Sequence, residues 1–118
     1  MKSNSILFSE KKKLVKYNAS KDVSELEFDF EYKIYGISRI DNYVFVTTYS
    51  NWGTTYTSLV AFDSGKKLWT LEEIFYSVHI IGDKLIYKDK KKCFNGIDIN
   101  SGKNIFNTKP PFKWSTPK

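Results

Sequence analysis

Few side chains in this 118-residue sequence have the chemistry of a catalyst. It contains one histidine, His79, and one cysteine, Cys93. A general base needs a partner within hydrogen-bond reach, and no motif ties a nucleophile or an acid to His79. Cys93 follows three lysines, and positive charge beside a thiol lowers its pKa and raises its reactivity. We nevertheless expect an ordinary strand histidine, an incidental thiol and no enzymatic activity.

The sequence also lacks the patterns that hold metals or phosphates. One cysteine and one histidine exclude an all-cysteine or multi-histidine metal site. The pairs Gly65-Lys66 and Gly102-Lys103 have no upstream glycine-rich loop of the phosphate-binding kind, and each is typical of a hairpin turn. We therefore predict no cofactor and no metal ion.

Acidic residues alternate with apolar ones over residues 25–35. In an extended strand, one face would carry four carboxylates and the other would carry apolar side chains. Because the carboxylates spread along about 13 Å of strand, they do not converge on one cation. We interpret the row as a docking strip for a basic partner. The alternative is a solvated face relieved by neighbouring lysines. The row consists of Glu25, Glu27, Asp29 and Glu31.

The segment 49–56 places aromatic side chains at the apex of a predicted hairpin. Its rings belong to Tyr49, Trp52 and Tyr56. Rings exposed together are the residue types that anchor protein interfaces. We therefore predict that these three residues bind a partner. The alternative is that the loop folds back and covers the open end of the core.

Lysine runs give the chain its net charge of +6. With 17% aromatic residues, they are compatible with binding of single-stranded nucleic acid by a β-barrel. Against this, the runs fall at predicted turns, where lysine keeps a surface soluble, and the acidic row would repel phosphates. We favour a protein partner and keep the nucleic-acid-binding barrel as an alternative. The lysines are those of 11–13 and Lys88, Lys90, Lys91 and Lys92, of which the last four are predicted to contact the partner.

Short strands must position these residues. Apolar and polar residues alternate over most of the chain, and pairs such as Asp41-Asn42 and Gly82-Asp83 mark tight turns between the runs. Short connections imply antiparallel pairing. Residues 71–75 allow a single helical turn. The expected strands are 5–8, 13–17, 25–35, 37–40, 43–48, 55–62, 68–70, 78–81, 85–88, 94–99 and 104–107.

The predicted fold is all-β: an antiparallel meander of propeller-like four-stranded units, packed as a sandwich or half-barrel. We expect a single β domain over residues 1–109 and a C-terminal tail over 110–118, which begins with two prolines. No apolar stretch reaches the roughly 18 residues of a membrane helix, and the start lacks the apolar core of a signal peptide. We therefore expect a cytoplasmic protein with no membrane contact.

Two stretches repeat one pattern about 40 residues apart, as propeller blades do. The pattern resembles the repeat of quinoprotein-like (PQQ-type) β-propellers, small-x-Asp-x-x-x-Gly-x-x-x-Trp. The resemblance covers about residues 37–108, and 14–18 looks like a degenerate copy of 59–63. The matching residues are Gly96, Asp98, Gly102 and Phe106, with Phe in place of Trp, and Ala61, Asp63, Gly65 and Trp69, with two residues fewer between Asp and Gly.

About two to two and a half units are too few to close a propeller, and no cofactor residue of that family is matched. The resemblance therefore implies packed antiparallel sheets and no enzyme. In size, β build and lack of catalytic residues, the chain also resembles small bacterial toxin-immunity proteins. That resemblance implies a non-enzymatic protein-binding module that neutralises a contact-dependent toxin, for example a nuclease. Besides the nucleic-acid-binding barrel, a propeller-like structural subunit that self-assembles is the remaining alternative.

Overall fold

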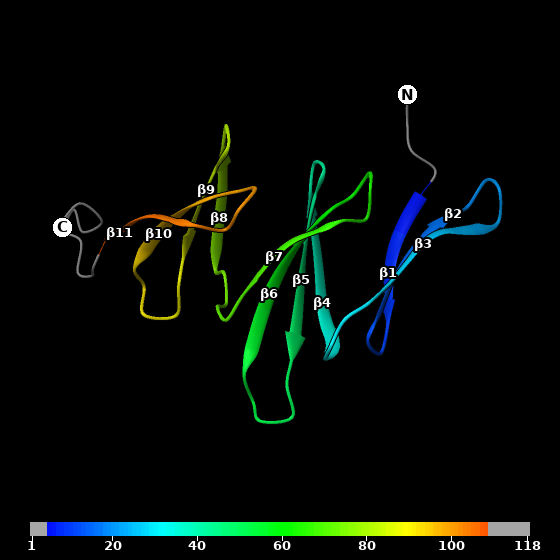
Figure 1. Ribbon diagram of the computed structural model, residues 1–118, viewed down its shortest axis with the longest axis horizontal. Coiled ribbons are helices and arrows are strands. Elements are labelled where there is room, and N and C mark those ends of the chain that lie inside the picture. The colour runs from blue at the N-terminus through cyan, green and yellow to red at the C-terminus, as the bar shows by residue number, and fades with distance from the viewer. Residues whose placement is uncertain (1–4, 109–118) are drawn as a thin grey trace, which may run out of the picture. The chain divides into compact units, whose positions relative to one another are not determined.

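The structure is a computed structural model that describes residues 5–108 (Figure 1). Within this range the chain forms eleven strands and no helix, in three sheets whose strands follow the order of the sequence. All strand pairs are antiparallel, so the predicted all-β meander is confirmed. The tail expected over 110–118 lies outside the described residues.

The chain divides into two compact units, Met1–Glu72 and Glu73–Lys118. The first unit contains two sheets and the second contains one. The first sheet consists of β1 (Ser5–Glu10), β2 (Lys13–Asn18) and β3 (Val23–Asp29). The second consists of β4 (Lys33–Ile40), β5 (Tyr43–Tyr49), β6 (Thr55–Ala61) and β7 (Lys67–Leu71). The third consists of β8 (Ser77–Ile81), β9 (Lys84–Lys88), β10 (Phe94–Asp98) and β11 (Asn104–Thr108).

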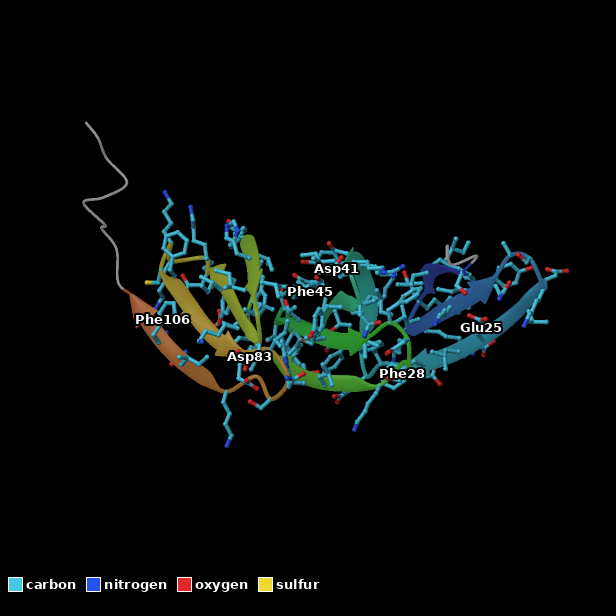
Figure 2. The ribbon with its side chains drawn as sticks, turned by 90° about the horizontal axis from the view of Figure 1, so that it is seen from above. Glu25, Phe28, Asp41, Phe45, Asp83 and Phe106 are labelled. Carbon is cyan, nitrogen blue, oxygen red and sulfur yellow. The ribbon has the colours of Figure 1, made fainter. Side chains whose placement is uncertain are left out.

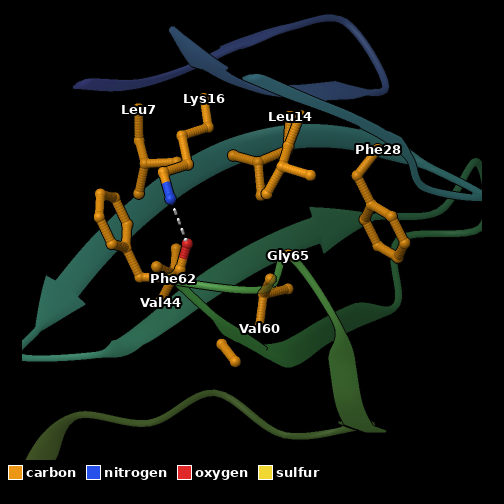
Figure 3. Close-up of a pocket in the computed structure, with 10 residues that line it drawn as sticks. Leu7, Leu14, Lys16, Phe28, Val44, Val60, Phe62 and Gly65 are labelled. Carbon is orange, nitrogen blue, oxygen red and sulfur yellow. Dashed lines mark hydrogen bonds between the residues drawn. The ribbon is translucent and has the colours of Figure 1, made fainter. Parts of the chain in front are cut away.

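The two sheets of the first unit pack face to face through a hydrophobic core. Because successive side chains of a strand point to opposite faces, each sheet contributes one face to this core. Figure 3 shows Leu7, Leu14 and Phe28 of the first sheet turned toward Val44 and Val60 of the second. The buried core residues are Leu14, Phe30, Ile34, Val44, Val46, Val60 and Phe62, with Leu7, Phe28 and Ile37 packed against them.

A lysine joins these two sheets at the edge of the core. The Nζ of Lys16 donates a hydrogen bond of 2.9 Å to the backbone oxygen of Phe62 (Figure 3). The same Nζ lies 4.2 Å from the centroid of the Phe62 ring, and the guanidinium carbon of Arg39 lies 3.5 Å from it. Both cations are therefore stabilised by the face of this ring.

The three sheets repeat one turn. After β2, β6 and β10, a backbone N–H bonds the carbonyl four residues earlier at 2.8 Å, and the residue that donates it has a positive φ. In all three sheets a register shift lies beside this turn, between the strand before it and the strand after it. The internal repeat is therefore structural and includes the first sheet. The donor–acceptor pairs are Asp22–Asn18, Gly65–Ala61 and Gly102–Asp98.

These hydrogen bonds correct two details of the sequence alignment. Matching Gly65 to Gly102 places Ala61, and not Asp63, at the position of Asp98, so no residues are missing between the two motif positions. They also align Asn18 with Ala61, which shifts the expected match between 14–18 and 59–63 by two residues.

The first sheet has three strands, whereas each of the other two sheets has four. The register pairs Ser5 with Asn18, Tyr43 with Ala61, and Lys84 with Asp98, so β1, β5 and β9 occupy the same place in their sheets. β4 precedes β5 and β8 precedes β9. In the described part of the chain, the first sheet has no strand at that position, beside β1.

The expected strand over 25–35 is in fact two strands, β3 and β4. The alternating pattern runs on across the break, but the backbone does not. Phe30 N–H donates to Lys12 O and Ile34 N–H donates to Lys11 O, both at 2.8 Å. The turn between β1 and β2 thus binds the backbone on both sides of the break, and the chain crosses there to the second sheet.

Two smaller expectations were also wrong. Gly36, expected to end a strand, lies inside β4 at a register shift between Ile34 and Gly36. Residues 71–75 form no helical turn: Leu71 ends β7, and an irregular segment follows. Glycine frequently marks such an irregularity within a strand, and this explains the first error.

Candidate functional site

The loop 50–54, between β5 and β6, is a turn held by hydrogen bonds. The Oγ of Ser50 accepts hydrogen bonds from the N–H groups of Trp52 (3.3 Å) and Thr54 (3.1 Å). Ser50 N–H donates to Thr54 O at 2.9 Å, and Gly53 N–H donates to Ser50 O at 3.1 Å. The φ of Gly53 is 85°, a conformation that glycine adopts without strain. The buried Ser50 therefore fixes the loop.

Trp52 lies at the apex of this turn, and 92% of its surface is exposed. Large apolar rings are normally covered for most of their area, because their burial is strongly favourable. Since the loop backbone is already fixed, a partner could cover the indole without first ordering the chain. Trp52 is thus presented in the way that an interface anchor requires.

Two tyrosines extend this aromatic surface. The rings of Tyr35 and Tyr49 lie edge to face, with centroids 5.8 Å apart and an angle of 86° between their planes. Together with Lys33, Ser50 and Asn51 they line an open hollow of about 590 Å³. A hollow of this size, with ring walls and an ammonium group, can receive side chains of another molecule.

Tyr56 does not belong to this surface. Tyr49 is paired with Thr55, and Tyr56 is paired with Thr48, so the alternation of the strands turns Tyr56 to the opposite face of the sheet from Tyr49. There its ring stacks on that of Tyr32, with centroids 5.5 Å apart and 14° between the planes. The structure therefore separates Tyr56 from Tyr49, with which it was grouped.

Glu31 lies beside the stacked tyrosines and not in the acidic row. β3 ends before it, and Glu31, Tyr32, Tyr56 and Lys67 are among the residues that line a second hollow of about 130 Å³. The negative charge of Glu31 raises the pKa of Tyr32, with smaller contributions from burial and from Tyr56. The carboxylate thus faces phenol groups, 
and its surroundings differ from those expected for a docking strip.

The register shift in β3 divides the rest of the acidic row. Glu27 and Asp29 lie on the face of the first sheet opposite the core. The carboxylate of Glu25 accepts hydrogen bonds from Ser5 Oγ (2.6 Å) and Asn18 Nδ2 (2.8 Å), which belong to the other face. The bond from Asn18, then that from Ser5, lowers the pKa of Glu25.

A lysine of β2 neutralises part of this row. The Nζ of Lys13 lies 3.2 Å from Glu27 Oε1, and Lys13 is the register partner of Asp29. The hydrogen bond to Glu27 and then its charge raise the pKa of Lys13, to which Asp29 and Glu10 add. A solvated face relieved by lysines, the alternative interpretation, therefore describes part of what the structure contains.

The loop 89–93, in the second unit, has the same frame as the loop 50–54. The Oδ1 of Asp89 accepts hydrogen bonds from the N–H groups of Lys91 and Cys93, both at 2.9 Å. Asp89 N–H donates to Cys93 O at 2.9 Å, and Lys92 N–H donates to Asp89 O at 3.0 Å. The φ of Lys92 is 68°. The exposed apex consists of Lys90, Lys91 and Lys92, so three of the predicted lysines lie together.

Lys88 lies apart from this apex. It is half-buried at the end of β9, and its Nζ lies 5.8 Å from the centroid of the Phe94 ring. Beneath the loop, Asn95 Nδ2 donates to Asp89 Oδ2 at 2.9 Å. Burial alone would raise the pKa of Asp89, but the bonds from Asn95, Cys93 and Lys91 outweigh burial and lower it.

The two residues with catalytic potential lie on a strand and in a turn. His79 is exposed on β8, and the half-buried Cys93 bonds Asp89 through its backbone. Within residues 5–108, no three His, Cys, Asp or Glu side chains are grouped so that they could hold a metal ion. In the same range, no helix is long and apolar enough to span a membrane.

Sequence reasoning missed Tyr35 and Lys33 as members of the aromatic surface. Both belong to β4, which the sequence pattern merged with β3. The register shift between Ile34 and Gly36 takes Tyr35 out of the regular alternation and leaves it exposed. An isolated tyrosine just before a glycine, at the end of an alternating run, was the available signal.

No protein-family model matches the sequence, and no curated protein matches it. Solved structures do. BamB from Moraxella catarrhalis is 19% identical with a TM-score of 0.67, over 93% of this chain and 34% of that one. A europium-containing methanol dehydrogenase is 11% identical (TM-score 0.60; 91% and 23%). KlAtg21, solved in complex with the coiled coil of AgAtg16, is 14% identical (TM-score 0.64; 94% and 40%).

These similar structures are β-propeller proteins, and the likeness shows that the present chain has the propeller type of sheet. The propeller-like repeat expected from the sequence is thereby confirmed. The chain spans 23% to 40% of the length of the three proteins named. At these identities the likeness concerns the fold alone.

Proposed function

We propose that this chain is a non-enzymatic protein-binding module whose contact surface is the Trp52 loop with Tyr35 and Tyr49. The observation that carries the proposal is the 92% exposure of Trp52 on a loop that is fixed by hydrogen bonds. Tryptophan and tyrosine are enriched among the residues that dominate binding energies at interfaces. A preorganised loop also lowers the entropy lost on association.

The hollow between Tyr35, Tyr49 and the start of the loop 50–54 indicates the chemistry of the partner. Tyr35 and Tyr49 present ring surfaces and hydroxyl groups, and Lys33 presents an ammonium group. A protein segment with an apolar or aromatic side chain next to a carboxylate satisfies both. Its apolar group would pack against the rings, and its carboxylate would meet Lys33.

The local charge favours protein over single-stranded nucleic acid. A phosphate backbone is bound by clustered positive charge. The turn between β1 and β2 bonds the backbone beside Lys33, which brings basic residues to this end of the first unit. Acidic residues lie at the same end, so a phosphate chain would meet both signs. The basic residues are Lys11, Lys12, Lys13 and Lys33, and the acidic ones are Glu10, Asp29 and Glu31.

A finer form of the proposal names the partner as a bacterial toxin domain and the chain as its cytoplasmic immunity protein. Its support is the small size and the lack of a catalytic motif in the sequence. KlAtg21, a similar structure, was solved bound to a coiled coil, which illustrates that a propeller protein can take a protein partner. Neutralisation would then consist of steric exclusion of the substrate of the toxin by the bound module.

Affinity capture from the native host tests the proposal. Immobilised wild type, Trp52→Ala and Lys91→Ala are compared. The sequence assigned Lys91 to the partner contact, but it lies outside the surface proposed here, and its loop has the same frame as the Trp52 loop, so it serves as the matched control. We expect a protein retained by wild type and Lys91→Ala and reduced at least about tenfold by Trp52→Ala, since a hot-spot truncation removes about 2 kcal/mol or more. Recovery of a toxin encoded beside this gene would support the finer form.

Two results would contradict it. Equal retention by all three proteins would show that Trp52 is not an anchor. Retention of a single-stranded DNA oligonucleotide that weakens steeply with salt, and that is lost in Trp52→Ala, would favour the nucleic-acid alternative.

A further inference from the structure

β1 presents two apolar side chains on the face of the first sheet opposite the core. Ile6 is 54% exposed and Phe8 is 41% exposed. The repeat register matches Ile6 to Val44 of β5 and Leu85 of β9, and it matches Phe8 to Val46 and Tyr87. These four counterparts are at most 3% exposed. The same position is apolar in all three sheets, and it is covered in two of them.

β11 shows a similar contrast on the third sheet. Phe106 (Figure 2) is the register partner of Gly96, as Trp69 of β7 is of Leu59, and both pairs adjoin the register shift of the repeat. Trp69 is 8% exposed, whereas Phe106 is 36% exposed. Ile81 of β8 lies on the same face of the sheet as Phe106 and is also exposed.

We name these surfaces by their residues. The leading face is the outer face of the first sheet, with Ile6, Phe8, Glu10, Lys13, Glu27 and Asp29. The trailing face is the face of the third sheet with Ile81, Lys84, Ile86, Lys88, Asp98 and Phe106. The leading face carries three acids and one base, and the trailing face carries two lysines and one acid. The two faces are therefore apolar surfaces of opposite net charge.

The first unit already contains one contact between faces of these two kinds. Leu26 of β3 is the counterpart of Phe106, because both lie across from the residue beside the register shift. Leu26 lines a small apolar cavity together with Val44 and Val60 of the second sheet. Val44 is the counterpart of Ile6. The face of the first sheet that carries Leu26 thus corresponds to the trailing face. It packs on the face of the second sheet that carries Val44, which corresponds to the leading face.

We propose that a second copy of this chain covers the leading face with its own trailing face. The contact would repeat the packing of the first sheet on the second, and the opposite charges of the two faces would select this pairing. Because two different faces meet, the association is head to tail, and each added copy leaves one face of each kind open unless a ring closes. It uses neither Trp52 nor Tyr35, so its test is independent of the proposed function.

Sedimentation velocity of the full chain over a range of concentrations tests this proposal. We expect wild type to sediment above the mass of one chain as the concentration rises. Phe8→Lys and Phe106→Glu each place on one face a charge that the opposite face repels, so each variant should remain at the mass of one chain. An equimolar mixture of the two variants should form a species of two chains, because each retains the face that the other has lost. Tyr76→Glu places a charge on another exposed ring, which belongs to neither face, and should sediment as wild type does.

Circular dichroism of each variant must match wild type, which we expect because both replaced rings are partly exposed. If Phe8→Lys fails to fold, Ile6→Lys replaces it on the leading face, and Ile81→Glu replaces Phe106→Glu on the trailing face. Wild type that stays at one chain at every concentration would overturn the proposal. So would a mixture of single-face variants that does not associate while wild type does, since this would indicate a symmetric contact through one face.

Discussion

β1 and β5 occupy the same place in their sheets but differ in cover. Val44 and Val46 of β5 are fully buried against the first sheet, whereas Ile6 and Phe8 of β1 remain open to solvent. The residue types do not explain this difference, because all four are apolar. What differs is the neighbour: β5 has the first sheet over it, and the described chain places no sheet over that face of β1. Exposed apolar residues at β1 thus point to a contact outside the single chain.

The loops 50–54 and 89–93 provide a second comparison. Ser50 and Asp89 make the same two side-chain hydrogen bonds to the backbone, and the turns have the same backbone bonds. Trp52 occupies the apex of one loop, and lysines occupy the apex of the other. The frame does not depend on the apex residues, so these can be used to contact other molecules.

The largest expected effect compares the covered and uncovered positions of the repeat. Val46→Ala should lower the free energy of unfolding by about 2 kcal/mol, because it removes buried methyl groups and leaves a cavity. Phe8→Ala removes more atoms but should lower it by less than about 1 kcal/mol in dilute protein, since its ring is partly in water already. Urea denaturation measures both values. Equal losses would contradict the comparison.

Two glycines with positive φ allow the contribution of the contact between the first two sheets to stability to be measured. Gly65 has a φ of 73°, and a Cβ added there would collide with the side chain of Leu26. Gly82 has a φ of 64° and open space around it. Gly82→Ala should cost about 1 kcal/mol for its backbone conformation, and Gly65→Ala should cost more, up to about 2 kcal/mol, because its Cβ would also displace Leu26. Thermal and urea unfolding would show whether the two losses differ as expected.

The side chain that holds the loop 89–93, Asp89, can be replaced by serine, the residue that holds the loop 50–54. Asp89→Ala should lower the free energy of unfolding by about 1 kcal/mol, because it removes hydrogen bonds to Lys91, Cys93 and Asn95. Asp89→Ser should restore most of this at neutral pH, since Ser50 supports the other loop in the same way. A serine variant as unstable as the alanine variant would show that the frames are not equivalent.

The same pair of variants has an expected pH dependence. The pKa of Asp89 lies below its ordinary value of 3.8, so the folded protein binds fewer protons there than the unfolded chain does. The stabilisation is complete above the ordinary value and is lost as the pH falls through the lower folded-state pKa. Acid unfolding followed by circular dichroism should therefore show a weaker decline in stability for Asp89→Ser than for wild type.

The smallest expected effect on stability is at the loop apices. Trp52→Ala and Lys91→Ala should each change the free energy of unfolding by no more than about 0.5 kcal/mol, because both side chains are exposed. Urea unfolding provides the measurement. A large loss for Trp52→Ala would mean that the indole supports the fold, and the case for a binding role would then fail.

Local patterns predicted most of the strands. Alternation and turn pairs such as Asp41-Asn42 located the hairpins, because both signals arise from residues adjacent in sequence. The break between β3 and β4 escaped prediction, since it depends on hydrogen bonds to Lys11 and Lys12 from residues about 20 positions away. The division of the acidic row had the same cause: a register shift in β3 moves Glu25 to the other face.

The sequence predicted residues of the candidate site only where they lie close together in one segment of the chain. Trp52 and Tyr49 could be grouped, because they belong to one hairpin. Tyr35 joins them through the pairing of β4 with β5, which no local pattern specifies. The likeness of the loops 50–54 and 89–93 was also hidden, since serine and aspartate perform the same task and the apex residues have nothing in common.

Amide hydrogen exchange tests the unequal cover of the repeat most directly. In dilute protein, the amides of β1 should exchange much faster than those of β5, because β1 has an open face and, in the described chain, a strand on one edge only. As the protein concentration rises, exchange from β1 should slow while exchange from β5 stays constant. Equal protection of the two strands in dilute protein would contradict the claim that β1 is uncovered in the single chain. Exchange from β1 that does not change with protein concentration would contradict its cover by a second copy.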